Sequence, residues 1–267
     1  MDKKTLLHLR LPAPVDRRSS HPVACLVMAV LAKMNVIWRV PLILFLTIFM
    51  GTISVLCSLF DGTGRLQHGC AVLWARMILA IARAKVQITG LENLVPGRAY
   101  ILAANHLSMF DIWVFLAYLP FQFRFVAKES LFRWPFLGWH LRRSGNISID
   151  RRNPRQAVHS LEAASRKTGS GISIVVFPEG MRTWGETVGP FKRGSFLLAQ
   201  HAGVPLVPVT IIGSHRLLPR GSAMIQPGEI EVRIHDPIEY HEYKDLDLQT
   251  VAESVHQKIL ESYRQVS

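Results

Sequence analysis

Residues 99–119 read AYILAANHLSMFDIWVFLAYL, and this stretch contains the pattern that decides the fold class. It opens with a short apolar run, Ala99–Ala104, of the kind that forms a buried β-strand. A loop with polar residues follows, and the apolar stretch Ile112–Leu119 then has the length and composition of a helix. The stretch therefore predicts a strand, a loop and a helix in direct succession, which is the repeating pattern of α/β proteins.

The same alternation continues along the rest of the chain. Strands are predicted over Val86–Thr89, Ala99–Ala104, Phe123–Ala127, Asn146–Ile149, Ile172–Phe177, Pro205–Ile211 and Ile230–Ile234. Helices are predicted over Ile112–Leu119, Trp134–Arg143, Pro154–Lys167, Gly194–Ala202 and Leu248–Tyr263. Strands that alternate with helices predict the α/β class, with a mostly parallel sheet flanked by helices. Two prolines, Pro205 and Pro208, lie in one of these strands and should interrupt its hydrogen-bond ladder, as in an edge strand.

An apolar segment precedes this region. Residues 40–60, VPLILFLTIFMGTISVLCSLF, are 21 residues without a charge. At about 1.5 Å per residue, a helix of this length crosses the hydrocarbon core of a bilayer, which is about 30 Å thick. A buried core helix is the alternative, but such helices are usually shorter and have a polar face. The segment therefore predicts an N-terminal hydrophobic helical region that anchors the chain in a membrane.

The charge balance of the chain is consistent with a membrane surface. The 31 Lys and Arg residues exceed the 19 Asp and Glu residues, which gives a net charge of +12, while 49% of residues are hydrophobic. A strongly basic chain usually has an anionic partner, either nucleic acid or a membrane surface. The apolar segment 40–60 argues against a nucleic-acid-binding protein and in favour of the membrane.

The path of the chain through the membrane has two solutions. Basic residues flank the apolar segment on both sides, and both flanks therefore prefer the cytoplasmic side. One solution is a hairpin of 23–38 and 41–60 that breaks near Arg39 and Pro41, with Arg39 near the far interface. The other is a re-entrant segment that bends around Gly51. Both return the chain to the cytoplasmic side, and the sequence leaves both open.

Residues 66–85, LQHGCAVLWARMILAIARAK, predict a further helix. Arg76 and Arg83 share one face, while Leu73, Met77 and Ile81 lie on another. A basic stripe opposite long aliphatic side chains suits a helix in the lipid headgroup region. Packing of the same helix onto the globular domain is the alternative.

Asn105–Asp111, NHLSMFD, is the first stretch that could carry chemistry. His106 lies in the loop after a strand, and Asp111 comes early in the next helix. The loop can fold back so that the carboxylate meets one imidazole nitrogen, which leaves the other nitrogen as a general base. The chain has no G-x-S-x-G motif, so the nucleophile would be a hydroxyl group of the substrate. A histidine that caps the helix is the alternative interpretation.

Two later stretches could bind an anion. Gly145–Arg152, GNISIDRR, ends in an acid and two arginines, and guanidinium groups match the geometry of phosphate oxygens. Further arginines stand at positions 142, 143 and 155, although a solvated basic helix end would look the same. Phe177–Arg182, FPEGMR, follows a buried strand, and its Pro and Gly predict a turn that displays Glu179 and Arg182. The alternative there is a turn with a surface ion pair.

In this order, the stretches resemble the glycerolipid acyltransferase family, typified by bacterial 1-acyl-glycerol-3-phosphate acyltransferase. That family carries N-H-x-x-x-x-D, G-x-x-x-I-D-R, F-P-E-G-T-R and V-P-x-V-P-V. The corresponding stretches here are NHLSMFD, GNISIDR, FPEGMR and VPLVPV, and the resemblance extends over about residues 70–240. One departure is Met181, where the family usually has Thr.

The resemblance implies roles for individual residues. His106, held by Asp111, would take the proton from the acceptor hydroxyl. Arg151 and Arg182 would hold the phosphate of the acceptor, and the turn residues Glu179 and Gly180 would help to place it. Lys128, after the strand Phe123–Ala127, is a further candidate for phosphate binding. No metal ion is implied, and VPLVPV could form a wall around an acyl chain.

The resemblance also implies an activity and a domain organisation. An acyl group would pass from acyl-ACP or acyl-CoA, as co-substrate and without a cofactor, to a lysolipid hydroxyl. The expected acceptor is 1-acyl-sn-glycerol-3-phosphate, which gives phosphatidic acid, and the alternative acceptor is a lyso-ornithine lipid. The expected parts are a basic tail (1–22), membrane-anchoring and interfacial helices (23–85) and an acyltransferase domain (86–267).

The expected partners are the membrane lipid acceptor, the acyl carrier protein or CoA thioester and an anionic membrane surface, with no nucleic acid. The expected location is the bacterial inner membrane, with the catalytic domain on the cytoplasmic side. A membrane-anchored lipid-binding protein without activity is the non-enzyme alternative. The joint presence of His106, Asp111, Glu179 and Arg182 argues against it.

Overall fold

The structure is a computed structural model that describes residues 22–150, 171–184 and 187–265, with side chains of the first helix from Ile37 onward. The predicted helix Pro154–Lys167 and the candidate phosphate ligand Arg151 lie outside the described residues. So does the expected basic tail, except for its last residue.

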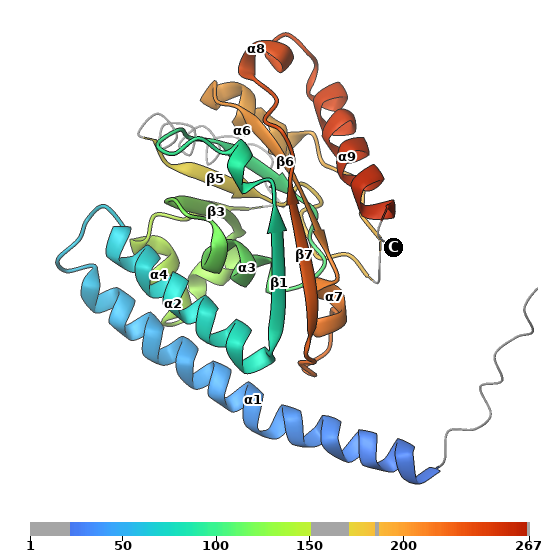
Figure 1. Ribbon diagram of the computed structural model, residues 1–267. Helices are drawn as coiled ribbons and strands as arrows, with labels where there is room; N and C mark the ends of the chain where they lie inside the picture. Colours follow the sequence, from blue (N-terminus) through green and yellow to red (C-terminus); the bar gives the residue numbers. More distant parts are fainter. Residues whose placement is uncertain (1–21, 151–170, 185–186, 266–267) are drawn as a thin grey trace, which may run out of the picture.

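A seven-stranded mixed sheet forms the centre of the molecule, in the order β1-β7-β6-β2-β5-β3-β4 (Figure 1). The strands are β1 (Ala84–Thr89), β2 (Ile101–Ala104), β3 (Phe123–Lys128), β4 (Ile147–Ile149), β5 (Ser173–Val176), β6 (Leu206–Ile212) and β7 (Gly228–Ile234). Strands β6, β2, β5, β3 and β4 are parallel to one another, whereas β7 is antiparallel to β6 and parallel to β1. The predicted α/β class with a mostly parallel sheet is confirmed.

The expectation of an edge strand at the two prolines is wrong. Strand β6 lies inside the sheet, between β2 and β7. The carbonyl of Pro208 accepts a hydrogen bond of 3.0 Å from the backbone N–H of His235, next to the ladder pair Val209–Ile234. The N–H and C=O of a strand residue point to the same side, so an N–H at position 208 would also point toward β7. The residue pairs between β6 and β7 begin only at Val209, so the absent N–H of Pro208 lies at the end of this ladder. An interior strand tolerates the proline at that position.

Helices cover both faces of the sheet. Helices α2 (Arg65–Ala82) and α3 (Phe110–Tyr118) lie on one side, whereas α6 (Gly194–Ala202) and α9 (Leu248–Arg264) lie on the other (Figure 1). Strand β2 shows the division, because Leu102 and Ala104 join the core under α2 and α3 while Ile101 and Ala103 join the core under α6 and α9. This alternation is the two-residue period of a strand that is buried on both faces.

Shorter elements complete the chain. They are the helices α4 (Leu137–Arg143), α7 (Ser214–Leu217) and α8 (Tyr240–Tyr243) and the 3-10 helices Leu91–Asn93 and Glu129–Arg133. The prediction of one helix over Trp134–Arg143 is therefore right for Leu137–Arg143 and wrong for the first three residues, since Phe136 has a positive φ of 58° and precedes the first turn of α4.

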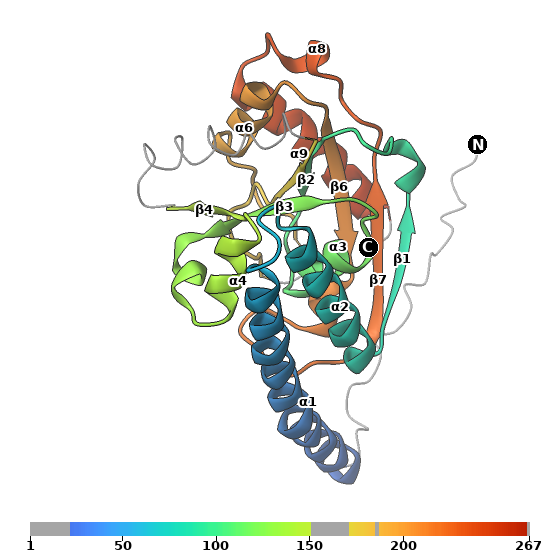
Figure 2. The same cartoon turned by 90° about the vertical axis from the view of Figure 1, so that its left-hand side faces the viewer.

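The first helix differs from both membrane topologies that the sequence suggested. Helix α1 (Pro22–Cys57) runs continuously through Pro41 and Gly51, so neither the break near Arg39 nor the bend around Gly51 is present. The chain turns back instead at residues 58–64, where the Asp61 carboxylate accepts hydrogen bonds of 2.7 Å from the backbone N–H groups of Thr63 and Leu66. Helix α2 then returns alongside α1 (Figure 2). An apolar helix can accommodate an interior proline because neighbouring groups satisfy the freed carbonyl.

Arg39 also lies elsewhere than the hairpin interpretation placed it. Its side chain is only 4% exposed, and its Nη1 donates a hydrogen bond of 2.8 Å to the carbonyl of Ile225, on the globular part. Arg39 therefore holds α1 against the domain and does not extend to a far membrane interface.

Helix α2 packs onto the globular part by one face. Ala75, Ile78 and Leu79 are buried in the core, and Arg76 donates a hydrogen bond of 3.3 Å to the carbonyl of Ala117 in α3. Leu73, on the opposite face, is 52% exposed. Packing on the domain is thus confirmed for one face, and a headgroup location for the other face stays a prediction.

Candidate active site

His106 and Asp111 meet as the sequence predicted. The His106 Nδ1 lies 2.8 Å from the Asp111 Oδ2, which also accepts hydrogen bonds from the backbone N–H groups of Leu107 (2.7 Å) and Ser108 (2.9 Å). Because an ionised carboxylate only accepts hydrogen bonds, Nδ1 must carry the proton in this contact. The Asp111 side chain is fully buried and that of His106 is 13% exposed, so the Nε2 nitrogen is the one available as a base.

The loop that carries His106 is fixed at both ends of the histidine backbone. Its N–H donates to the Glu179 Oε1 (3.0 Å), and its carbonyl accepts from the N–H of Thr183 (3.0 Å). Asn105, which precedes it, exchanges two hydrogen bonds of 2.8 and 2.7 Å with the backbone of Ile211 in β6. The FPEGMR stretch and β6 therefore position the base, although β6 follows it by about one hundred residues.

An aromatic stack orients the imidazole ring. Phe177 stacks on His106 with ring centroids 4.1 Å apart, and Phe125 stacks on Phe177 with ring centroids 6.2 Å apart. The role of Phe177 was not predicted from the sequence. The only available signal was its place directly before the Pro-Glu-Gly turn.

The FPEGMR stretch forms the predicted turn. The N–H of Gly180 donates to the carbonyl of Phe177 (2.9 Å), and Gly180 has a φ of +75°, a conformation that favours glycine. A side chain at Gly180 would also meet the Nζ of Lys192 at 3.1 Å. Lys192, an exposed residue that sequence reasoning did not assign, thus lies against the turn. Its position in PFKRG, after the next loop, was the only signal.

Glu179 is a buried carboxyl group and makes no surface ion pair. Its side chain is 5% exposed, and burial raises its pKa to about 8, although the N–H groups of His106 and Gly189 lower it. At neutral pH it is therefore mainly protonated. Its clear role is to hold the backbone of His106, and contact with an acceptor stays a prediction.

The predicted cationic residues do not all converge. Lys128 lies exposed at the carboxyl end of β3, the same end of the sheet at which β2 leads to His106, but no contact joins it to the His106–Asp111 pair. Arg142, one of the arginines near the GNISIDRR stretch that could bind an anion, donates to the carbonyl of Phe132. Arg182 lies next to Thr183, whose backbone is bonded to His106. Among the described arginines of the prediction, Arg182 is thus the one whose chain neighbour is bonded to the backbone of His106.

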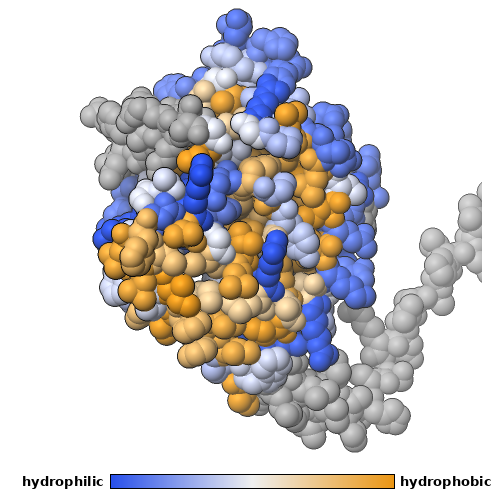
Figure 3. Space-filling model, turned by 60° about the vertical axis from the view of Figure 1, so that its left-hand side comes forward, coloured by the Kyte–Doolittle hydropathy of each residue, from blue (hydrophilic) through white to orange (hydrophobic). Residues whose placement is uncertain are grey.

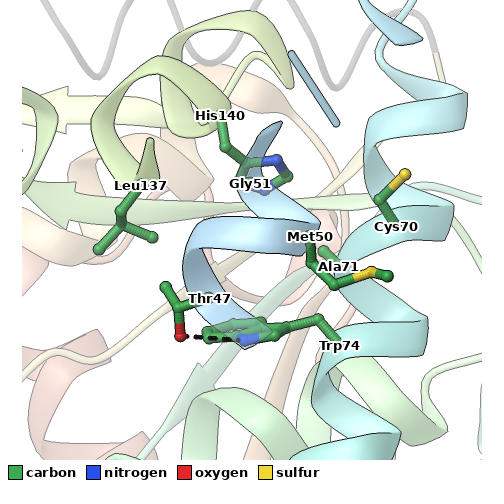
Figure 4. A pocket seen from close by; sticks show the side chains of 8 residues that line it. All are labelled: Thr47, Met50, Gly51, Cys70, Ala71, Trp74, Leu137 and His140. Carbon is green, nitrogen blue, oxygen red and sulfur yellow. Dashed lines mark hydrogen bonds between the residues drawn. The ribbon is translucent and has the colours of Figure 1, made fainter. Parts of the chain in front are cut away.

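A separate apolar pocket lies where α1, α2 and α4 meet (Figure 4). It is lined by Thr47, Met50, Gly51, Cys70, Ala71, Trp74, Leu137 and His140. None of these is a predicted site residue, so the chemistry and this pocket occupy different places. Within the described residues, no three His, Cys, Asp or Glu side chains are grouped so that they could hold a metal ion.

Comparison with known proteins identifies the family of the chain. The acyltransferase family model matches residues 85–212. A chloroplastic 1-acyl-sn-glycerol-3-phosphate acyltransferase of Brassica napus is 35% identical over 212 residues, which are 78% of this chain and 60% of the relative. The enzyme of that name from Saccharomyces cerevisiae is 30% identical over 82% of this chain and 73% of its own length. The chain therefore spans less than two thirds of the plant relative.

A solved structure shares the fold. The 1-acyl-sn-glycerophosphate acyltransferase PlsC from Thermotoga maritima matches with a TM-score of 0.76 and 24% identity, over 89% of this chain and 97% of that chain. The ordered motifs, the His106–Asp111 pair and these similarities lead to one conclusion: this chain belongs to the acyltransferase family that includes the 1-acyl-sn-glycerol-3-phosphate acyltransferases.

Proposed function

We propose that this protein is a membrane-bound O-acyltransferase that converts 1-acyl-sn-glycerol-3-phosphate to phosphatidic acid, with acyl-ACP or acyl-CoA as donor. The observation that supports this most directly is the His106–Asp111 pair, held at 2.8 Å in a loop that the FPEGMR turn fixes. The relatives named as 1-acyl-sn-glycerol-3-phosphate acyltransferases support the choice of acceptor.

The reaction follows from the orientation of His106. Its Nε2 removes the proton from the free hydroxyl of the acceptor while that oxygen attacks the carbonyl carbon of the thioester. Asp111 stabilises the imidazolium that forms, since it accepts the Nδ1 proton in the hydrogen bond. When the tetrahedral intermediate collapses, the C–S bond breaks and the thiolate takes the proton back from Nε2. Transfer is direct, without an acyl-enzyme.

The phosphate of the acceptor binds at the FPEGMR turn. Arg182 offers a guanidinium group that matches phosphate oxygens, and Glu179 and Gly180 set the shape of the turn. Arg151 and Lys128 are proposed as additional phosphate ligands from the sequence alone.

The membrane position explains access to a water-insoluble acceptor. Ile37–Cys57 of α1 has 21 residues with a mean hydropathy of 2.4, which is long and apolar enough to cross a membrane. Large apolar side chains stay exposed along α1, including Leu44, Phe45 and Phe49. We place the protein in the bacterial inner membrane, with the His106 site on the cytoplasmic side, where acyl-ACP and acyl-CoA are present.

The test offers membranes that contain the protein lysophosphatidate and a lyso-ornithine lipid in parallel, each with labelled acyl-ACP or acyl-CoA. We expect label in phosphatidic acid, and label only in the ornithine lipid would overturn the choice of acceptor. The same assay identifies the donor, because label is transferred only from the thioester that the protein uses.

In that assay, His106→Ala should reduce the rate by about 10²- to 10⁴-fold, the usual contribution of a general base. Lys244→Ala is the control, because Lys244 follows α8 at the end of the molecule opposite α1 (Figure 1). Sedimentation with membranes should be unchanged in both variants. A wild-type rate in His106→Ala would rule out the general-base role.

A further inference from the structure

A segment of the chain not assigned above, 217–221, contacts both loops of the site. The Ser108 Oγ, in the His106 loop, donates a hydrogen bond of 2.9 Å to the carbonyl of Leu218. Two residues later, the Arg220 Nη1 donates a hydrogen bond of 2.5 Å to the carbonyl of Arg182. The segment therefore touches the loop of the base and the turn of the proposed phosphate ligand.

The guanidinium group of Arg220 is held in a defined position. It lies over the Trp184 ring, 4.5 Å from the centroid, and its Nη1 is 3.9 Å from the Met181 Sδ. Gly221, which follows Arg220, has a φ of +83°, a backbone conformation that favours glycine. Among the residues that the structure describes, the guanidinium group of Arg220 contacts a carbonyl, a thioether and an aromatic face, and none of these three neutralises its positive charge.

The residues that hold Arg220 are exposed at the surface. Trp184 is 66% exposed and Met181 is 54% exposed, although both are large and apolar. Only one of the five N–H groups of an arginine is used in the bond to the Arg182 carbonyl, so others can bind a ligand. A positioned arginine whose remaining donors are available is suited to an anion.

This anion site would lie beside the base. Arg220 is bonded to the carbonyl of Arg182. The next residue, Thr183, donates its backbone N–H to the carbonyl of His106, so this short chain of bonds connects Arg220 with the loop of the general base. A phosphate monoester carries close to two negative charges at neutral pH, since its second pKa is about 6. Two arginines match that charge better than one, and the Arg220 side chain reaches the backbone of Arg182.

We propose that Arg220 binds the phosphate monoester of the acceptor together with Arg182, and that Trp184 and Met181 hold it in place. The proposal rests on the proposed function and adds a determinant of acceptor specificity to it. It also gives a role to Met181, at the position where the family usually has Thr: its thioether contacts the guanidinium group of Arg220.

The experiment measures steady-state kinetics of Arg220→Ala and Arg220→Lys with two acceptors, lysophosphatidate and 1-acylglycerol. The second acceptor keeps the sn-2 hydroxyl and has a hydroxyl in place of the phosphate, so acylation is measured at the sn-2 position. In Arg220→Ala we expect the KM for lysophosphatidate to rise by about 10- to 100-fold, as for a lost charged hydrogen bond. The kcat, the KM for the thioester and the kinetics with 1-acylglycerol should change less than about twofold. Arg220→Lys should restore part of the affinity, because lysine keeps the charge but not the planar donors.

A second measurement separates direct binding from a purely structural role. In the wild type, the KM for lysophosphatidate should fall as the pH rises through about 6 and the phosphate gains its second charge. Arg220→Ala should flatten this dependence, whereas loss of the bond to the Arg182 backbone alone would leave its shape unchanged. Met181→Thr should raise the same KM by a few-fold, and Lys244→Ala is the control for loss of one surface charge.

Two results would overturn the proposal: an unchanged KM for lysophosphatidate in Arg220→Ala, or an equal loss of kcat with both acceptors. Failure of the proposed function is a different result, since the wild type would then not acylate lysophosphatidate. Binding of lysophosphatidate vesicles to the wild type and to Arg220→Ala would still test the phosphate site in that case.

Discussion

Individual residues of the site are defined by their hydrogen bonds more than by their charges. Glu179 shows this, because the FPEGMR motif suggested a displayed carboxylate, whereas the side chain is buried and accepts the backbone N–H of His106. Burial disfavours the ionised form of a carboxyl group, and the pKa of Glu179 is accordingly raised to about 8. The residue therefore links the stability of the His106 loop to pH.

Glu179→Gln tests this link. The ordinary pKa of the carboxyl group is 4.5, so between pH 4.5 and about 8 the folded protein holds a proton that the unfolded chain has lost. The free energy of unfolding must then fall as the pH rises through this window, by at most about 1.4 kcal/mol per pH unit. Glutamine keeps the acceptor oxygen but does not titrate. We expect thermal unfolding in detergent to show a gain in Tm for Glu179→Gln at pH 8 and little difference at pH 5. An equal difference at both pH values would mean that Glu179 titrates normally.

At the scale of elements, the long helix α1 is attached to the domain at a few polar points. Besides the bond from Arg39 to Ile225, the Ser54 Oγ lies 2.6 Å from the His140 Nδ1 in α4, and the Trp74 Nε1 donates to the Thr47 Oγ1 at 3.2 Å. These contacts fix α1 relative to α2 and α4, whereas much of its apolar surface is exposed. Together with the packing of Ile43 on the core and the close approach of Gly51 to Phe136, they set the orientation of α1 on the domain.

Arg39→Met should loosen this attachment. Methionine keeps an apolar side chain of similar length but leaves the Ile225 carbonyl without its charged donor. A hydrogen bond of this kind contributes about 1.5–3 kcal/mol. We expect faster proteolysis within the turn at residues 58–64 and a lower Tm in detergent, and Ile37→Ala, at a side chain that is 70% exposed, is the control. Identical proteolysis of wild type and Arg39→Met would contradict this attachment.

The molecule as a whole presents one apolar face. Figure 3 shows an extended hydrophobic surface, interrupted by a few hydrophilic side chains, on the side of the molecule that carries α1, α2 and α4. Exposed residues of this face include Leu44, Phe45, Phe49, Trp134 and Trp139. Tryptophans prefer the boundary between hydrocarbon and headgroups, so this face is suited to a lipid surface. The net charge of +12 would favour an anionic one.

Two charges on this face should weaken membrane binding. Phe45 and Phe49 stack at 5.9 Å between centroids and are 60% and 48% exposed. Burial of one such side chain contributes about 1.5–3 kcal/mol, so Phe45→Glu with Phe49→Glu should reduce partitioning into anionic vesicles by more than about tenfold. Leu246→Glu is the matched control, since Leu246 is 45% exposed and follows α8 at the opposite end of the molecule. Equal sedimentation of the wild type and the Phe45→Glu, Phe49→Glu variant with vesicles would show that α1 is not responsible for membrane binding.

The sequence by itself determined the features that depend on neighbouring residues. All seven described strands were predicted within a few residues, because each is a short apolar run or alternates between apolar and polar residues. The His106–Asp111 contact was also predictable, since five residues between a strand and a helix limit how the two side chains can lie.

Tertiary structure alone decided the contacts between segments far apart in the chain. One example is the position of β6 inside the sheet. Others are the stacking of Phe177 on His106, the bond of Arg220 to the Arg182 carbonyl, and the bond of Arg39 to the Ile225 carbonyl, 186 residues away. The physical reason is that the order of the strands depends on how helices cover both faces of the sheet. The sequence around a single strand does not determine this order. The continuous helix through Pro41 is a further example, because neighbouring groups decide whether a proline breaks a helix.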